Sequence, residues 1–165
     1  MLRALLAGLA GAVTLNLIHE TVRRVRPEDA PRMDVLGMRA LTRVFRAADA
    51  NPPPAPKLHT LALAGDVVAN TLYYSLAGTG KHAAARGLAL GALAGVGGVL
   101  LPGPLGLGEK QSGRTPQTMA MTVAWYTLGG LAAGLAGRAL RKQKPAAAES
   151  RYGHSARPWV GGRSW

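Results

Sequence analysis

Four long apolar segments set the strongest limit on what this chain can fold into. They cover about residues 2–25, 58–78, 83–101 and 116–141 of the 165-residue sequence. An α-helix rises about 1.5 Å per residue, so about 20 residues are enough to cross the roughly 30 Å hydrocarbon core of a bilayer. We therefore predict an all-α integral membrane bundle of about four transmembrane helices, formed by residues 1–144 as one domain.

The kind of apolar residue in these segments also favours lipid over a water-soluble core. Only 5% of the residues are aromatic and Phe occurs once, whereas 22 residues are Gly. A soluble core of this size needs bulky side chains for buried area, but small residues and Leu suit helices that pack closely in lipid. The chain has no Cys, which excludes disulfides, thiolate metal sites and cysteine nucleophiles.

The first segment has some features of a signal peptide. Arg3 gives it a short basic start, and Ala10-Gly11-Ala12 is similar to a cleavage site. The apolar helical pattern continues past Ala12 to about Val25, however. We therefore predict that this segment is a retained helix.

An amphipathic, basic helix is predicted for residues 32–48, between the first two apolar segments. Its apolar residues recur at helical spacing, and Arg39, Arg43 and Arg46 share the opposite face. This pattern is typical of the membrane interface, where arginines bind anionic lipid headgroups, although a helix packed on its own bundle has the same pattern. Residues 51–56 read Asn-Pro-Pro-Pro-Ala-Pro, which predicts a stiff, non-helical linker.

The net charge of +12 makes nucleic-acid binding one explanation to weigh. The basic residues flank the apolar segments, as they do in membrane proteins, and no face alternates basic and aromatic side chains. We therefore expect membrane lipids, and other membrane subunits or a second copy, as partners, and no nucleic acid. A polar C-terminal tail is predicted for residues 145–165.

The orientation of the bundle does not follow from charge. Four crossings place ten basic residues on each side, so the positive-inside rule gives no answer. Three explanations stay open: residues 87–101 re-enter rather than cross, copies insert both ways, or partners fix the orientation. We favour a bacterial cytoplasmic membrane with both termini inside.

Glycines at a spacing of four mark the helix surfaces that pack most closely. Gly87, Gly91 and Gly95 form one row, and Gly130 and Gly134 form a second. Such rows let two backbones approach, where dispersion and Cα–H···O contacts stabilise the pair. An internal partner helix is the simpler expectation, and a second subunit is the alternative.

Polar residues inside the apolar segments predict an intramembrane network. Its candidate members are Asn16, Glu20, Asp66, Asn70 and Thr122. An ionisable group at the bilayer centre costs from a few to more than about ten kcal/mol, so Asp66 is expected to meet Asn16, Thr122 or an arginine. We favour a structural network that fixes helix register over a proton or cation site. Glu20 lies among arginines near a helix end, and a surface ion pair is its simpler role.

No arrangement in the sequence indicates catalysis. Residues 78–82 fall short of a phosphate-binding loop, and no serine, histidine and acid set is recognisable. We expect no enzyme activity and no cofactor. Haem or pigment ligation by His19, His59 or His82 stays open, while a metal site lacks recognised ligand spacing.

The segment Ala-Pro-Arg-Met-Asp-Val-Leu-Gly-Met-Arg at residues 30–39 resembles part of small bacterial multi-pass membrane proteins of uncharacterised function. The resemblance implies a bacterial membrane and carries no activity. The role that we expect is an accessory or structural subunit of a membrane complex. The alternative is a small oligomeric proton-coupled transporter or channel that uses Asp66.

Overall fold

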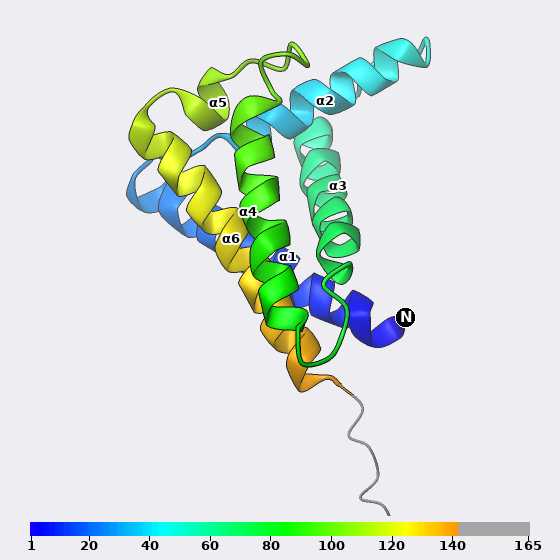
Figure 1. Ribbon diagram of the computed structural model, residues 1–165. Helices are drawn as coiled ribbons and strands as arrows, with labels where there is room; N and C mark the ends of the chain where they lie inside the picture. Colours follow the sequence, from blue (N-terminus) through cyan, green and yellow to red (C-terminus); the bar gives the residue numbers. More distant parts are fainter. Residues whose placement is uncertain (142–165) are drawn as a thin grey trace, which may run out of the picture.

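The computed structural model describes residues 1–141 and is all-helical over that range. The predicted tail at residues 145–165 lies outside the described residues. The helices are α1 (Leu2–Val25), α2 (Met33–Ala47), α3 (Ala55–Ser75), α4 (Ala83–Leu100), α5 (Lys110–Gly113) and α6 (Pro116–Ala139) (Figure 1).

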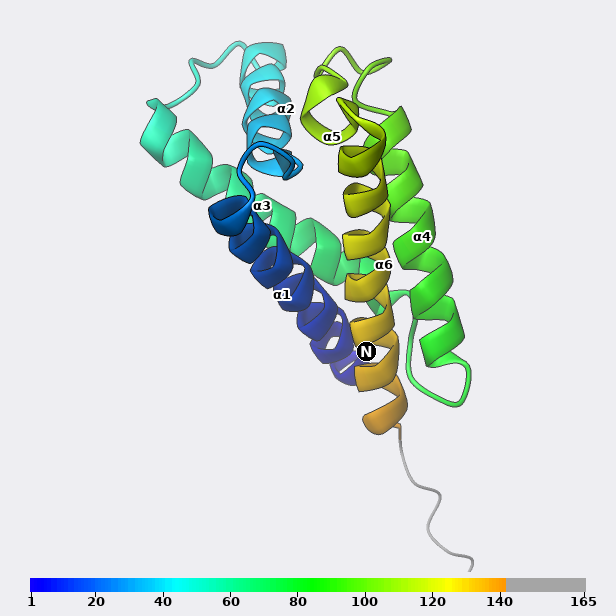
Figure 2. The same ribbon diagram turned by 90° about the vertical axis from the view of Figure 1, so that its left-hand side faces the viewer.

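The four long helices run alternately in opposite directions, and α2 and α5 lie together at one end of the bundle (Figures 1 and 2). The N-terminus, the α3–α4 connection and the end of α6 lie at the other end. There, Arg3 Nη1 donates a hydrogen bond of 3.0 Å to the carbonyl oxygen of Leu140. The most extensive contacts join α4 to α6, followed by α1 to α6 and α1 to α3.

Three of these helices, α1, α4 and α6, are long and apolar enough to cross a membrane, which is compatible with a multi-pass membrane protein. The predicted count of about four therefore depends on α3. That helix has 21 residues, a sufficient length. Lys57, His59, Asp66 and Asn70 lower its apolar character, and it is not among the three.

The predicted linker at residues 51–56 is corrected at its end, because α3 begins at Ala55. Pro56 lies in the first turn of the helix, where the missing N–H of proline has no intrahelical partner to lose. The short helix α5 was not predicted. It lies in the polar connection before α6, which begins where Thr115 Oγ1 accepts a 3.1 Å hydrogen bond from the Thr118 amide.

The glycine rows place α4 directly against α6. A Cβ atom on Gly87 would lie 2.9 Å from Gly134 Cα, and one on Gly130 would lie 2.8 Å from Gly91 Cα. A Cβ on Gly95 would meet Val123 Cα at 2.6 Å. These separations are too short for any side chain, so the two backbones are in contact. The partner of each row is therefore within the chain.

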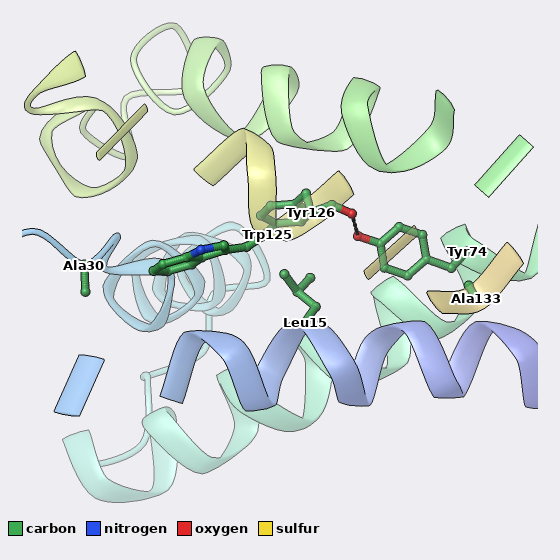
Figure 3. Close-up of a cluster of buried hydrophobic side chains, with 6 residues drawn as sticks. All are labelled: Leu15, Ala30, Tyr74, Trp125, Tyr126 and Ala133. Atoms are coloured by element: carbon green, nitrogen blue, oxygen red, sulfur yellow. Dashed lines mark hydrogen bonds between the residues drawn. The ribbon is translucent and has the colours of Figure 1, made fainter. Parts of the chain in front are cut away.

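The few aromatic side chains gather where α1, α3 and α6 meet (Figure 3). Tyr74 and Leu15 are fully buried, and Trp125 and Tyr126 are nearly so. Tyr74 Oη donates a 2.8 Å hydrogen bond to the Tyr126 carbonyl, which satisfies a hydroxyl that would otherwise be costly to bury. This cluster fixes α3 against the centre of α6.

The outward surfaces of all four long helices are apolar. Leu6, Leu72, Leu93 and Leu135, one from each helix, are 47–67% exposed. Exposed apolar side chains that surround a bundle are unfavourable in water and favourable in lipid. The exterior therefore resembles that of a membrane-embedded protein.

Candidate functional site

The candidate site is a wedge-shaped space between α1 and α3. At one end the two helices touch, since a Cβ on Gly8 would lie 2.8 Å from the Ser75 amide nitrogen. Towards α2 they separate around a cavity that side chains of both helices line. The wide end is covered by α2, where a Cβ on Gly37 would lie 3.3 Å from Ala62 Cβ.

This wedge contains a cavity of about 480 Å³. Apolar side chains from α1 and α3, among them Leu17, Leu63 and Val67, line much of it. Asn16 and Asp66 lie at its narrow end, and the charged residues of the α1 C-terminus lie at its wide end near α2. The walls of the cavity are thus mostly apolar, with polar groups at its narrow end and at its wide end.

Asp66 is held by two side-chain amides. Asn16 Nδ2 donates to Oδ2 at 3.0 Å, and Asn70 Nδ2 donates to Oδ1 at 2.9 Å. Each amide also bonds a backbone carbonyl of its own helix, which fixes its direction. Within residues 1–141, no Lys, Arg or His forms an ion pair with Asp66. Its carboxyl group therefore has hydrogen-bond donors but no ion-pair partner among the residues that the structure describes.

Glu20 lines the same cavity but does not join Asp66. Its Oε2 accepts from Arg23 Nη2 at 2.6 Å, and its Oε1 accepts from Arg24 Nε at 2.8 Å. These pairs lie at the wide, partly exposed end of the wedge. This is the geometry of a surface ion pair, the simpler of the two roles considered for Glu20.

Thr122 also lies apart from Asp66. Its buried hydroxyl is 2.9 Å from the carbonyl oxygens of both Thr118 and Ser112. It therefore links α6 to the end of α5. The predicted network is corrected here: Asn16, Asp66 and Asn70 come together, whereas Glu20 and Thr122 have other partners.

A second carboxylate at the cavity, Asp34 on α2, is paired with Arg32. Arg32 Nε and Nη2 donate to its two oxygens at 3.1 and 3.2 Å. Partial burial disfavours the ionised carboxylate, but the hydrogen bond and charge of Arg32 outweigh it and lower the pKa of Asp34. The same pairing raises the pKa of Arg32.

Two of the three candidate haem or pigment ligands line the cavity. His19 rests edge-on against Trp125 and Tyr126, with ring centroids 5.2 and 5.8 Å apart, and its Nε2 is buried without a partner among the described residues. His59 lies across the wedge on α3, whereas His82 precedes α4 at the opposite end of the bundle. The part of the chain that the structure describes holds no group of three or more metal-ligating side chains.

The arginines of α2 hold the connection between α4 and α5. Arg39 Nη1 donates to the Leu107 carbonyl at 2.6 Å, and Arg43 Nη2 donates to the Gly106 carbonyl at 2.8 Å. Gly106 adopts a positive φ of 63°, so the chain here turns out of any regular helix. The carbonyl oxygens of the turn therefore have no helical partners and accept hydrogen bonds from the arginines instead. Arg46 is exposed near the end of α2. Two of the three predicted headgroup ligands are thus engaged within the chain.

No protein-family model, curated protein or solved structure matches this chain. Its function is therefore inferred from its own residues and their arrangement.

Proposed function

We propose that the chain crosses a membrane four times, with α3 as the fourth crossing. Its 21 residues span about 31 Å, close to the thickness of a hydrocarbon core. Val68 and Leu72 are exposed on its outer surface, while Asn70 is buried and Asp66 faces the wedge. Polar groups turned inward and apolar groups turned outward are what a crossing helix needs.

In this arrangement α2 lies at the membrane surface on the side opposite both ends of the described chain. Arg46 is exposed there and is available to anionic headgroups. Arg39 and Arg43 are also exposed, so they can contact headgroups while they bond the loop. The membrane that we propose is the bacterial cytoplasmic membrane, with the termini inside.

The proposed role is that of a non-enzymatic accessory or structural subunit of a membrane complex. The observation that carries it is the second half of α2, which projects beyond the bundle (Figure 1). Val44 is 63% exposed there, although the same helix buries Leu36 in its first half. An amphipathic helix that buries its apolar side only in its first half leaves an apolar strip for another surface, such as a partner subunit.

Native electrophoresis after extraction in a mild detergent tests this role. We expect a species larger than the 17.1 kDa chain, with other polypeptides present. Val44→Asp should release them by placing a charge in the apolar strip, while Val44→Ala, which keeps the strip uncharged, serves as a matched control. A monomer in every detergent would contradict the proposal.

A second candidate, a small oligomeric proton-coupled transporter or channel, is favoured by one observation: the cavity reaches Asp66 near the middle of α3. Reconstituted Asp66→Asn protein should then lose proton-coupled flux. Unchanged flux would eliminate this carboxylate as the coupling site. Reporter fusions at both termini would also show whether copies insert in one orientation or two.

A further inference from the structure

We propose that the cavity between α1, α2 and α3 binds a lipophilic organic cation, with the carboxylate of Asp66 as its anionic anchor. This proposal requires only the arrangement of these three helices. It holds whether or not the chain is a subunit of a larger complex.

The charges around the cavity single out Asp66. Of the carboxylates that line it, Glu20 is shared by two arginines and Asp34 is paired with Arg32. Asp66 alone has no cationic partner among residues 1–141. A carboxylate that is shielded from water is costly to ionise without a compensating charge, which a bound cation would supply.

The hydrogen-bonding capacity of Asp66 leaves room for a ligand. A carboxylate has about four lone-pair sites, and each Asp66 oxygen accepts one side-chain amide, from Asn16 or from Asn70. Because both amides are also hydrogen-bonded to their own helices, they hold the carboxylate in place. They leave its remaining lone-pair sites unoccupied. One bound group can therefore approach a pre-positioned anion.

The walls of the cavity decide the class of cation. Val13, Leu17, Leu63 and Val67 surround the approach to Asp66 with apolar surface. A cavity of about 480 Å³ is within the size range of small-molecule sites, roughly 300–1,000 Å³. A small metal ion would need further hard ligands, and the described residues contain no such cluster. A cation with an apolar body matches both the charge and the walls.

The guanidinium groups at the wide end do not compete for Asp66. Arg23 lies seven residues beyond Asn16 on α1, about 10 Å along the helix axis. It and Arg24 already share the Glu20 carboxylate, and both are partly exposed to solvent. The anion at the narrow end is therefore left for a ligand.

Calorimetric titration of the purified full-length protein with tetraphenylphosphonium tests the proposal, with protein-free micelles as the blank. Asp66→Asn, which keeps the size of the side chain, should weaken binding by about 30-fold or more, equivalent to about 2 kcal/mol. Glu28→Gln is the matched control, because Glu28 is exposed and does not line the cavity, and we expect less than about a threefold change.

Three outcomes would overturn the proposal. One is wild-type protein that does not bind tetraphenylphosphonium up to its solubility limit. Another is equal affinity in wild type and Asp66→Asn. The third is equally tight binding of the uncharged triphenylphosphine oxide, which would mean that the cavity accepts apolar molecules without using the carboxylate.

A second pair of variants tests the location even where Asp66→Asn does not fold. Leu63 and Leu61 are both exposed on α3, at 50% and 39%, but only Leu63 lines the cavity. Leu63→Trp should therefore fill the cavity and weaken binding by about tenfold or more, while Leu61→Trp should not. Equal affinities for the two variants would place the bound cation elsewhere and contradict the proposal.

Discussion

The pairs α4–α6 and α1–α3 are both antiparallel, yet one is closed along its length and the other opens into a wedge. On α4, glycine recurs from Gly87 to Gly95, so every turn of the contact brings backbone to backbone. On α1, close contact with α3 occurs at the Gly8 backbone, whereas two turns later Asn16 reaches α3 through its side chain. Where small residues stop, the helices diverge, and the resulting space holds the polar groups.

The largest expected effect is on the closed pair. Gly87→Ala places a Cβ against the backbone of Gly130 and Gly134, which cannot move without separating the helices. We expect a loss of about 3 kcal/mol or more in the free energy of unfolding. Thermal and denaturant unfolding in detergent would measure it. Gly97→Ala is the control, because its nearest neighbour, a Leu101 methyl, is 3.5 Å away. Equal stability of the two variants would contradict the contact.

A smaller effect is expected in the wedge. Asn16→Ala removes one donor from the Asp66 carboxylate and one side-chain hydrogen bond between α1 and α3. The expected cost is about 1–3 kcal/mol, because a shielded acceptor loses its partner. Thr14→Ala should cost less than this, since the Thr14 hydroxyl bonds only the Ala10 carbonyl of its own helix. The same unfolding measurements compare the two variants. If Thr14→Ala proved as costly, the Asn16–Asp66 bond would contribute nothing of its own.

The smallest effect concerns pH at the α2 side of the wedge. Because Arg32 lowers the pKa of Asp34 below its ordinary value of 3.8, the pair stabilises the fold above about pH 4. That contribution is lost as the pH falls through the lowered pKa of the folded state. Melting temperatures between pH 6 and pH 3 should therefore fall slightly more steeply in wild type than in Arg32→Gln. Identical slopes would show that the ion pair adds no stability.

The packing of the closed α4–α6 pair could be predicted from the sequence more completely than the wedge between α1 and α3. Glycine spacing identifies both packing surfaces, and the long apolar runs predict the helices that carry them. The contact of Asp66 with Asn70 also follows from their spacing of four on one helix. Its contact with Asn16 was one of several that the sequence allowed, because periodicity gives the face of a helix and not its neighbour.

Other features depend on contacts between distant segments, and the sequence carries little signal for them. Arg39 and Arg43 share a face whether that face meets lipid headgroups or loop carbonyls. Thr122 was placed with Asp66 because both are polar, but the backbone of α5 supplies its nearer partner. The position of Pro56 in the first turn of α3 was missed because a run of prolines predicts an extended linker. The start of a helix tolerates proline equally well.

The arginine contacts of α2 have a further consequence for the molecule. The helix that covers the wide end of the wedge is fastened to α3 through Gly37 and, through Arg39, to the loop that follows α4. Shifting α2 away from the cavity therefore requires either that the guanidinium groups release the loop or that the loop moves with it. The open α1–α3 pair is in this way connected through α2 to the closed α4–α6 pair, although no residue of α4 or α6 lines the cavity.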